Sequence, residues 1–93
     1  MKLEEFRKNF PQFSNFIGAW FPDADFEKLS DEEVVRKFLE DNCKNQKEVL
    51  LEGNRLLNVI SEYWQELGYD ANRHFNNSEQ ARKWLNEVLN GLK

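Results

Sequence analysis

An aromatic-rich stretch near the N-terminus, residues 10–26 (FPQFSNFIGAWFPDADF), most constrains how this chain can fold. It contains both prolines and five of the eight phenylalanines of the chain. Pro11 suits the first turn of a helix, where its missing N–H costs nothing. Large apolar side chains then recur at helical spacing, which predicts a helix with one buried face formed by Phe13, Phe16, Ile17, Trp20 and Phe21. Such a face must be covered, so we expect the rest of the chain to pack around it.

Two residues are expected to shape this helix. Pro22 cannot continue a helix in the usual way, so we expect the chain to turn after Phe21 and enter a loop. Gly18 lies between two bulky turns, where a neighbouring backbone could approach closely.

The flanking segments predict two more helices. Leu3–Phe10 has apolar residues at helical spacing. Ser30 and Glu33 form a capping-box pattern, so a helix should begin there and fade near Asn42. Cys43 would be a small apolar filler at its end.

Residues 46–67 keep one apolar phase throughout. Asn45 is a candidate N-cap, with Glu48 at the capping-box position. The pattern permits one long helix or two helices separated near residues 58–60. Ordinary helices have about half the longer length, so we favour the break.

Gly68 is a candidate C-terminal cap for this region. The polar segment from Tyr69 to Ser78 is expected to be a loop that Tyr69 and Phe75 attach to the core.

A last helix is expected over Glu79–Asn90, capped by Asn77 or Ser78 and closed by Gly91. No segment alternates with period two, so we expect no sheet. The sequence therefore predicts an all-α fold, with residues 1–93 forming a compact single-domain bundle of five or six short helices.

The net charge of −4 is distributed unevenly along the chain. Residues 23–42 contain eight acidic and three basic side chains, whereas the segments before and after carry net charges of +1 and 0. Nucleic-acid binding needs a basic face, so this distribution argues against it. A basic protein partner fits it better.

Features of the sequence that bear on compartment favour the cytoplasm. Cys43 is the only cysteine, so no internal disulfide can form, which fits a reducing compartment. No apolar run approaches membrane-spanning length. Residues 1–8 lack the apolar centre of a signal peptide.

The residues that could carry catalysis or bind metal are few and scattered. Cys43 and His74 lie in different predicted elements, and His74 is expected to be a solvated loop residue. Asp23 and Asp25 suggest a calcium loop, but the later ligands and the glycine spacing are missing. We therefore expect no enzyme, no cofactor and no metal site, with a small hydrolase as the last-ranked alternative.

The opening motif resembles the N-terminal signature of a family of contact-dependent growth inhibition immunity proteins. These proteins open with an aromatic residue and Pro, followed by Asn-Phe-Leu-Gly and two aromatic residues. The matching residues here are Phe10-Pro11, Asn15-Phe16-Ile17-Gly18 and Trp20-Phe21. The resemblance covers nearly the whole chain, through Ser30–Glu33, Glu52, Leu56-Leu57, Leu67-Gly68-Tyr69 and Trp84-Leu85.

The chain departs from the family pattern directly after Phe21. Many relatives have a His-Gln-Asp-Trp-like sequence there, whereas this chain has Pro22 and Asp23, followed by Ala24, Asp25 and Phe26. Asp25 and Phe26 match the acid and the aromatic residue of the pattern. Any role of the family's histidine does not transfer.

The resemblance implies a cytoplasmic monomer that binds the C-terminal toxin domain of a delivered effector in a 1:1 complex. It neutralises that domain, commonly by covering the active site. Many such toxins are nucleases with basic clefts; a ribonuclease is favoured, and a DNase is the alternative. The acidic segment, with one aromatic anchor, is our hypothesis for the toxin-binding face: Asp23, Asp25, Glu27, Glu32, Glu33, Glu40, Asp41 and Trp20.

Simpler interpretations of the same residues stay open. The aromatic run can serve the core alone, and the acids can serve helix capping and solubility. Asp31 is expected to act through the helix dipole rather than as a contact to the toxin. The alternative function is a helical adaptor or regulator that holds a partner helix in an apolar groove.

Overall fold

The computed structural model describes residues 2–93, except for the side chains of residues 23–26, 42 and 43. Within this part of the chain there are six α-helices, one 3-10 turn and no strand, which confirms the predicted all-α fold. The helices are α1 (Lys2–Asn9), α2 (Pro11–Glu27), α3 (Asp31–Asn42), α4 (Gln46–Asn58), α5 (Ile60–Ala71) and α6 (Ser78–Leu92), and the 3-10 turn is Cys43–Asn45.

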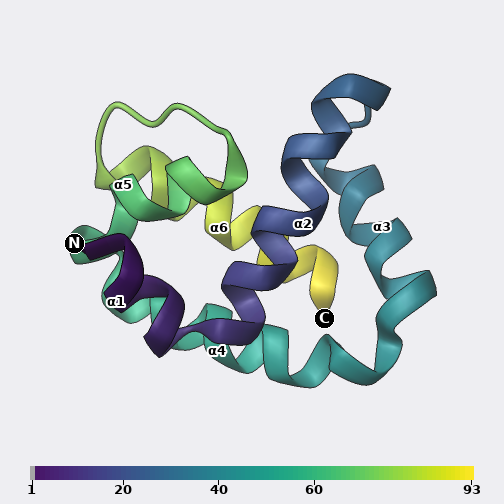
Figure 1. The fold of residues 1–93 in the computed structure, drawn as a ribbon, viewed down its shortest axis with the longest axis horizontal. Helices are drawn as coiled ribbons and strands as arrows, with labels where there is room; N and C mark the ends of the chain where they lie inside the picture. Colours follow the sequence, from purple (N-terminus) through teal and green to yellow (C-terminus); the bar gives the residue numbers. More distant parts are fainter. Residues whose placement is uncertain (1) are drawn as a thin grey trace.

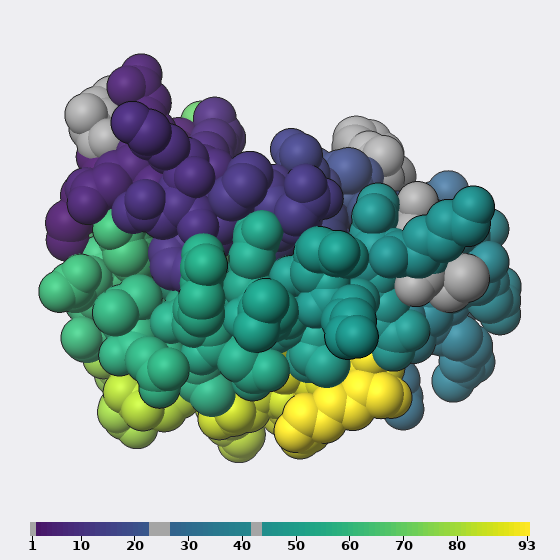
Figure 2. Space-filling model, turned by 90° about the horizontal axis from the view of Figure 1, so that it is seen from below, coloured from purple at the N-terminus to yellow at the C-terminus, as the bar shows by residue number. Residues whose placement is uncertain are grey.

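Helix α2 occupies the centre of the molecule (Figure 1). It packs against α1, α3, α4 and α5, while α6 packs against α3, α4 and α5. Figure 2 shows one face of the molecule, where α4 runs between the N-terminal helices and the end of α6. The aromatic helix is therefore the element around which the others are arranged, as the sequence predicted.

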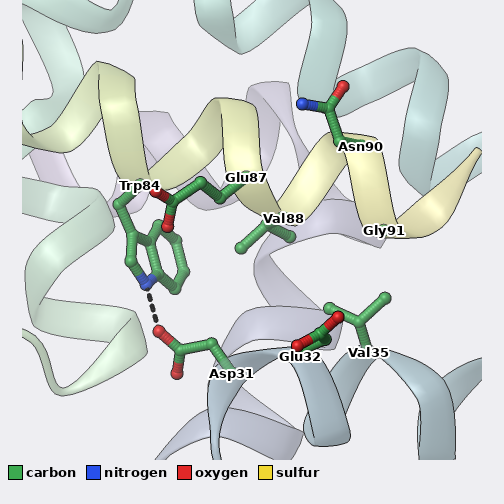
Figure 3. A pocket seen from close by; sticks show the side chains of 8 residues that line it. All are labelled: Asp31, Glu32, Val35, Trp84, Glu87, Val88, Asn90 and Gly91. Carbon is green, nitrogen blue, oxygen red and sulfur yellow. Dashed lines mark hydrogen bonds between the residues drawn. The ribbon is translucent and has the colours of Figure 1, made fainter.

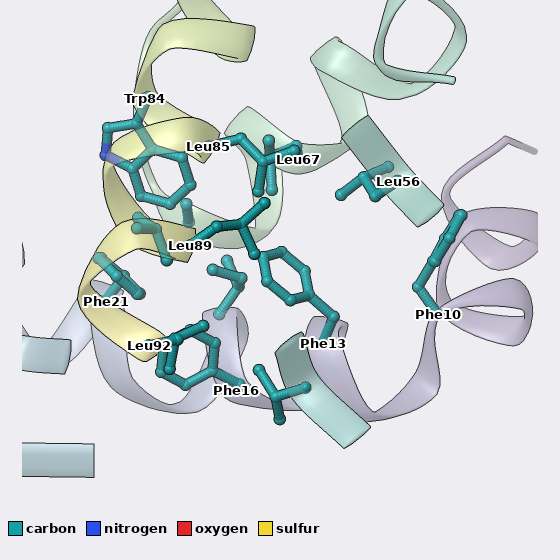
Figure 4. Close-up of a cluster of buried hydrophobic side chains, with 14 of the residues drawn as sticks. Phe10, Phe13, Phe16, Phe21, Leu56, Leu67, Trp84, Leu85, Leu89 and Leu92 are labelled. Carbon is teal, nitrogen blue, oxygen red and sulfur yellow. The ribbon is translucent and has the colours of Figure 1, made fainter. Parts of the chain in front are cut away.

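The predicted apolar face of α2 lies in the core of the protein, together with side chains of the other helices. Phe13, Phe16, Ile17 and Phe21 are buried, and Trp20 is partly buried against the ring of Phe38. Leucines from three other helices meet the phenylalanines of α2 (Figure 4): Leu56, Leu67, Leu85, Leu89 and Leu92. Each such side chain contributes roughly 1.5–3 kcal/mol when it leaves water.

Two charged residues of α4 bind backbone groups where α1 ends and α2 begins. The Glu52 carboxylate accepts hydrogen bonds from the backbone N–H groups of Gln12 and Phe13, at 2.9 and 3.0 Å. Arg55 donates to the carbonyl of Asn9 at 2.7 Å. An anion therefore caps the start of α2 and a cation caps the end of α1, as the helix dipoles favour.

An ion pair between an exposed arginine and a nearly buried carboxylate ties α1 to α5. Arg7 donates two hydrogen bonds to the Asp70 carboxylate, at 2.6 and 3.3 Å, and Asp70 is only 6% exposed. Pairing is the usual condition for burying a carboxylate, because an unpaired charge is costly to remove from water.

The expectation that the chain turns after Phe21 is wrong. Helix α2 continues through Pro22 to Glu27, and Lys28 then ends it with a left-handed backbone (φ 57°). Pro22 cannot donate to the carbonyl of Gly18, but Gly18 is exposed, so water can reach that carbonyl. The expected close approach at Gly18 is also wrong, since a Cβ there would meet nothing within 4 Å.

The predicted end of α5 at Gly68 is also wrong. The helix continues to Ala71, and Asn72 caps it in the left-handed region (φ 55°). Gly68 is used for packing, because a Cβ there would lie 2.9 Å from the carbonyl oxygen of Arg73. The loop is shorter than expected, and Tyr69 is 72% exposed rather than attached to the core, whereas Phe75 does pack on Trp84.

Of the other predicted helix boundaries, some are confirmed and some are wrong. The break between residues 58 and 60 is confirmed at Val59, and Asn77 caps α6 by accepting from the N–H of Gln80. Asn45 lies in the 3-10 turn and makes no side-chain capping bond, so the prediction for it is wrong. Gly91 does not close α6, which runs to Leu92. The expectation for Cys43 concerns a side chain outside the described residues.

None of the helices described here combines the length and the apolar character that crossing a membrane would require.

Candidate functional site: the acidic surface of α3

Helix α3 begins with the predicted capping box. The N–H of Glu33 donates to the hydroxyl of Ser30, and the N–H of Ser30 donates to the Glu33 carboxylate, both at 3.2 Å. The hydrogen bond from the Ser30 backbone, followed by that from its hydroxyl, lowers the pKa of Glu33. Glu33 therefore stabilises the start of α3 while its side chain remains at the surface.

Asp31 joins α3 to two other parts of the fold. Arg73 donates to its Oδ1 at 2.6 Å, and the indole N–H of Trp84 donates to its Oδ2 at 2.7 Å. Arg73 comes from the loop before α6, and Trp84 from α6 itself. Asp31 lies in the first turn of α3, where the helix dipole favours an anion, and its carboxylate in addition fixes α3 against α6.

A groove of about 340 Å³ lies between α3 and α6. Residues of both helices line it, and we call it the α3–α6 groove: Asp31, Glu32, Val35, Trp84, Glu87, Val88, Asn90 and Gly91. Figure 3 shows the side chains of α3 and α6 facing each other across it, while Asn90 points away. Valines form an apolar floor, and carboxylates from both helices stand at the rim.

The close approach of the two helices at one end of the groove depends on Gly91. A Cβ at this position would lie 3.1 Å from a methyl group of Val35. This contact gives Gly91 a packing role in place of the predicted capping role.

A second depression lies on the other side of α3, toward α2. We call it the α2–α3 hollow; it is lined by Ala19, Trp20, Glu27, Leu29, Val34, Lys37 and Asp41. Lys37 lies 4.0 Å from Glu27, and both side chains are more than half exposed, so their ion pair is weak. Trp20 contributes an aromatic surface to this hollow.

The structure distributes the predicted toxin-binding residues over several sides of α3 instead of gathering them in one pocket. Trp20, Glu27 and Asp41 meet at the α2–α3 hollow, and Glu32 lines the α3–α6 groove. Glu40 is exposed, and Glu33 is engaged in capping. The side chains of residues 23 and 25, both Asp, lie outside the described residues.

Glu87 and Trp84 also belong to the site, although they were not predicted from the sequence. Both belong to α6, far from the acidic segment in the chain. Their spacing of three residues places them on neighbouring positions of one helix face. That spacing alone does not indicate that the face would meet α3.

The structure leaves His74 exposed and brings no metal-ligand group together among the side chains that it describes. His74 is exposed, and its Nε2 lies 3.1 Å from the amide oxygen of Asn76. Among the side chains that the structure describes, no three His, Cys, Asp or Glu residues converge as metal ligands would.

Comparisons with family models, with curated proteins and with solved structures gave no match for this chain.

Proposed function

We propose that this protein is an immunity protein of the contact-dependent growth inhibition type, which binds a basic toxin domain through the acidic surface of α3. The toxin is a nuclease, with ribonuclease as the favoured activity. The protein acts by occupying the toxin's active-site cleft, where its carboxylates take the place of substrate phosphates. The motif resemblance described above supports the family, and the charge on α3 supports the mode of binding.

The observation that carries this proposal is a set of exposed carboxylates on one helix. Glu32, Glu40 and Asp41 are exposed, and within the described part of the chain none of them has an ion-pair or hydrogen-bond partner. A partner can therefore engage them without first breaking contacts inside this protein. Surfaces of one sign of charge also accelerate association with a partner of the opposite sign.

The alternative, an adaptor that holds a partner helix, is supported only by the apolar floor of the α3–α6 groove. Helix-in-groove binding needs space for anchors at positions i, i+3, i+4 and i+7. A groove of about 340 Å³ lies near the lower limit of ligand pockets and suits one or two side chains. The large exposed apolar residues, Leu51 and Tyr69, lie outside it. We therefore rank the adaptor second.

The proposal is tested by co-expression with a toxin. The gene for an immunity protein should lie directly downstream of a large gene with a variable 3′ end, and the domain encoded there is the toxin to use. Cells that express this domain should survive only when the present protein is co-expressed. If the protein fails to rescue them and does not bind the purified domain, the proposal is wrong.

A charge-matched pair of variants tests the surface itself. The triple variant Glu32→Lys, Glu40→Lys, Asp41→Lys reverses the charge of α3, while Glu4→Lys, Glu48→Lys, Glu62→Lys changes the net charge equally at exposed positions of other helices. Only the first should abolish rescue and weaken binding, by at least about a hundredfold, because reversed charges at a contact repel as well as fail to attract. Equal effects of both variants would show that position on α3 does not matter.

A further inference from the structure

The α3–α6 groove combines an apolar floor with two carboxylates, those of Glu32 and Glu87, for which the described residues offer no partner. Val35 and Val88 form the floor, and Trp84, a residue that is 8% exposed, lines one side. Glu32 and Glu87 are exposed, and the described part of the chain offers neither an ion pair nor a hydrogen bond to them. A long side chain with an apolar stem and a cationic end would satisfy both features.

The charged side chains at the rim give the groove a net negative charge. The Asp31 carboxylate already has a partner in Arg73, with 2.6 Å between Nη2 and Oδ1, and its other oxygen accepts from Trp84. The remaining lining residues with charge are Glu32 and Glu87. Two carboxylates on facing helices favour a cation between them and disfavour an anion or a neutral polar group.

The chain already binds one guanidinium next to this groove. Arg73 bonds to Asp31, and its guanidinium carbon lies 5.7 Å from the centre of the Phe21 ring. Carboxylate on one side and an aromatic ring on the other suit a planar guanidinium better than a strongly hydrated ammonium. In the groove, Glu32 or Glu87 would supply the carboxylate and Trp84 the aromatic surface.

We infer that the α3–α6 groove receives an arginine side chain of the basic partner. The stem of the arginine lies on Val35 and Val88, and its guanidinium pairs with Glu32 and Glu87 beside Trp84. This inference rests on the proposed function for the identity of the partner. The recognition chemistry itself can be tested without that partner.

The test uses Nα-acetyl-arginine amide as the probe and NMR spectroscopy of the intact protein as the readout. The indole N–H signal of Trp84 and the methyl signals of Val35 and Val88 should shift saturably, with a Kd on the order of 1–10 mM for one side chain. The indole signals of Trp20 and Trp64, which do not line the groove, serve as internal controls. The double variant Glu32→Gln, Glu87→Gln should bind at least about tenfold more weakly, as loss of charge-assisted bonds predicts.

Controls separate this inference from simpler explanations. The variant Glu48→Gln, Glu79→Gln, altered at exposed sites on α4 and α6 outside the groove, should bind the probe as well as the unaltered protein. Acetyl-citrulline amide, a neutral analogue of the probe, should not bind. Absence of saturable shifts, unchanged binding by the Glu32→Gln, Glu87→Gln variant, or equal binding of acetyl-lysine amide would overturn the arginine assignment.

The two proposals fail in different ways. If the protein rescues cells from the toxin while the arginine probe does not bind the groove, only the groove assignment is wrong. If the probe binds and the double variant loses that binding, but no rescue occurs, the groove assignment holds and the immunity function is wrong.

Discussion

The carboxylate of Asp31 uses both of its oxygens to join three segments of the chain. One oxygen accepts from Arg73 and the other from the indole of Trp84, so α3, the loop before α6 and α6 share one polar contact. The ring of Trp84 in turn packs against those of Phe21 and Phe75, with ring centres 5.1 and 5.7 Å away. Asp31 thereby fixes the position of the indole that lines the groove.

Removing this carboxylate should lower the free energy of unfolding, because its two partners lose their hydrogen-bond acceptor. Asp31→Ala leaves the nearly buried indole N–H without its acceptor and Arg73 without its anion. We expect a loss of about 1–3 kcal/mol in the free energy of unfolding. Glu32→Ala, at the adjacent exposed position, should change it by less than about 0.5 kcal/mol. Urea unfolding followed by circular dichroism measures both, and equal midpoints for the two variants would contradict the role of Asp31.

Two glycines in helices make a matched pair for testing the packing. A Cβ at Gly53 would overlap Leu89 and lie 2.9 Å from the ring of Phe13, whereas a Cβ at Gly18 would meet nothing within 4 Å. Gly53→Ala should therefore destabilise the protein by about 1–3 kcal/mol through overpacking. Gly18→Ala should stabilise it by about 0.5–1 kcal/mol, the ordinary gain for alanine in a helix. Thermal unfolding of both variants checks these opposite signs, and a shared sign would refute the packing assigned to α4.

Residue roles could be predicted from the sequence only where the partners are close in the chain. Ser30 and Glu33 are three residues apart, and their capping box was predicted correctly. The partners of Asp31 lie 42 and 53 residues away, so no local pattern reveals them. The same limitation explains why Glu87 was missed.

At the scale of the helices, tertiary contacts decide where a helix ends more than they decide which of its faces is buried. Periodicity identified the buried face of α2 and the apolar phase that α4 and α5 share, because burial repeats with the helical turn. The predicted ends at Pro22, Gly68 and Gly91 were wrong, because local breaker residues were overridden or used for packing. Glu52 shows the converse, since it caps a helix 40 residues away in the chain.

The cap at the start of α2 should contribute measurably to stability. Glu52→Ala removes the acceptor for the N–H groups of Gln12 and Phe13, and we expect a loss of about 1–2 kcal/mol. Glu52→Gln keeps an acceptor oxygen but loses the charge, so its loss should be smaller. Glu48→Ala, an exposed residue of the same helix, is the control. If Glu52→Ala and Glu48→Ala gave equal urea midpoints, the capping role of Glu52 would be refuted.

The cap at the start of α3 should make stability depend on pH. Its hydrogen bonds with Ser30 lower the pKa of Glu33 in the folded state below the ordinary value of 4.5. The stabilisation from this charge is therefore complete above about pH 4.5 and is lost as the pH falls through the lower folded pKa. The advantage of the unaltered protein over Glu33→Gln should be larger at about pH 6 than at about pH 3, as urea unfolding at each pH can measure. A difference that does not change between these pH values would contradict this assignment.

For the whole molecule, the fold was easier to predict than the candidate functional surface. The aromatic face of α2 had to be shielded from water, and amphipathic helices elsewhere in the chain could shield it. The all-α bundle could therefore be predicted from the sequence. The acidic segment was also evident, but the way in which α3 exposes it was not. Only the packing of α3 against α2 and α6 divides the acids between a groove and a hollow.

If the protein binds a basic toxin domain as proposed, the charge on α3 should appear in the kinetics of that association. Attraction between surfaces of opposite charge raises the association rate and is screened by salt. The association rate constant should fall by about tenfold or more between about 0.05 and 0.5 M NaCl. In the variant Glu32→Lys, Glu40→Lys, Asp41→Lys this salt dependence should flatten or reverse. Surface plasmon resonance can measure both, and identical slopes would argue against steering by α3.

The central place of α2 has a consequence for the synthesis of the protein. Helices α4 and α5, which cover much of its aromatic face, follow it in the chain by tens of residues. On the ribosome, its phenylalanines leave the exit tunnel before the helices that cover them have emerged. The nascent chain should therefore expose an apolar segment that attracts chaperones until residue 71 has emerged. Compaction of the chain should then occur late and in a single step.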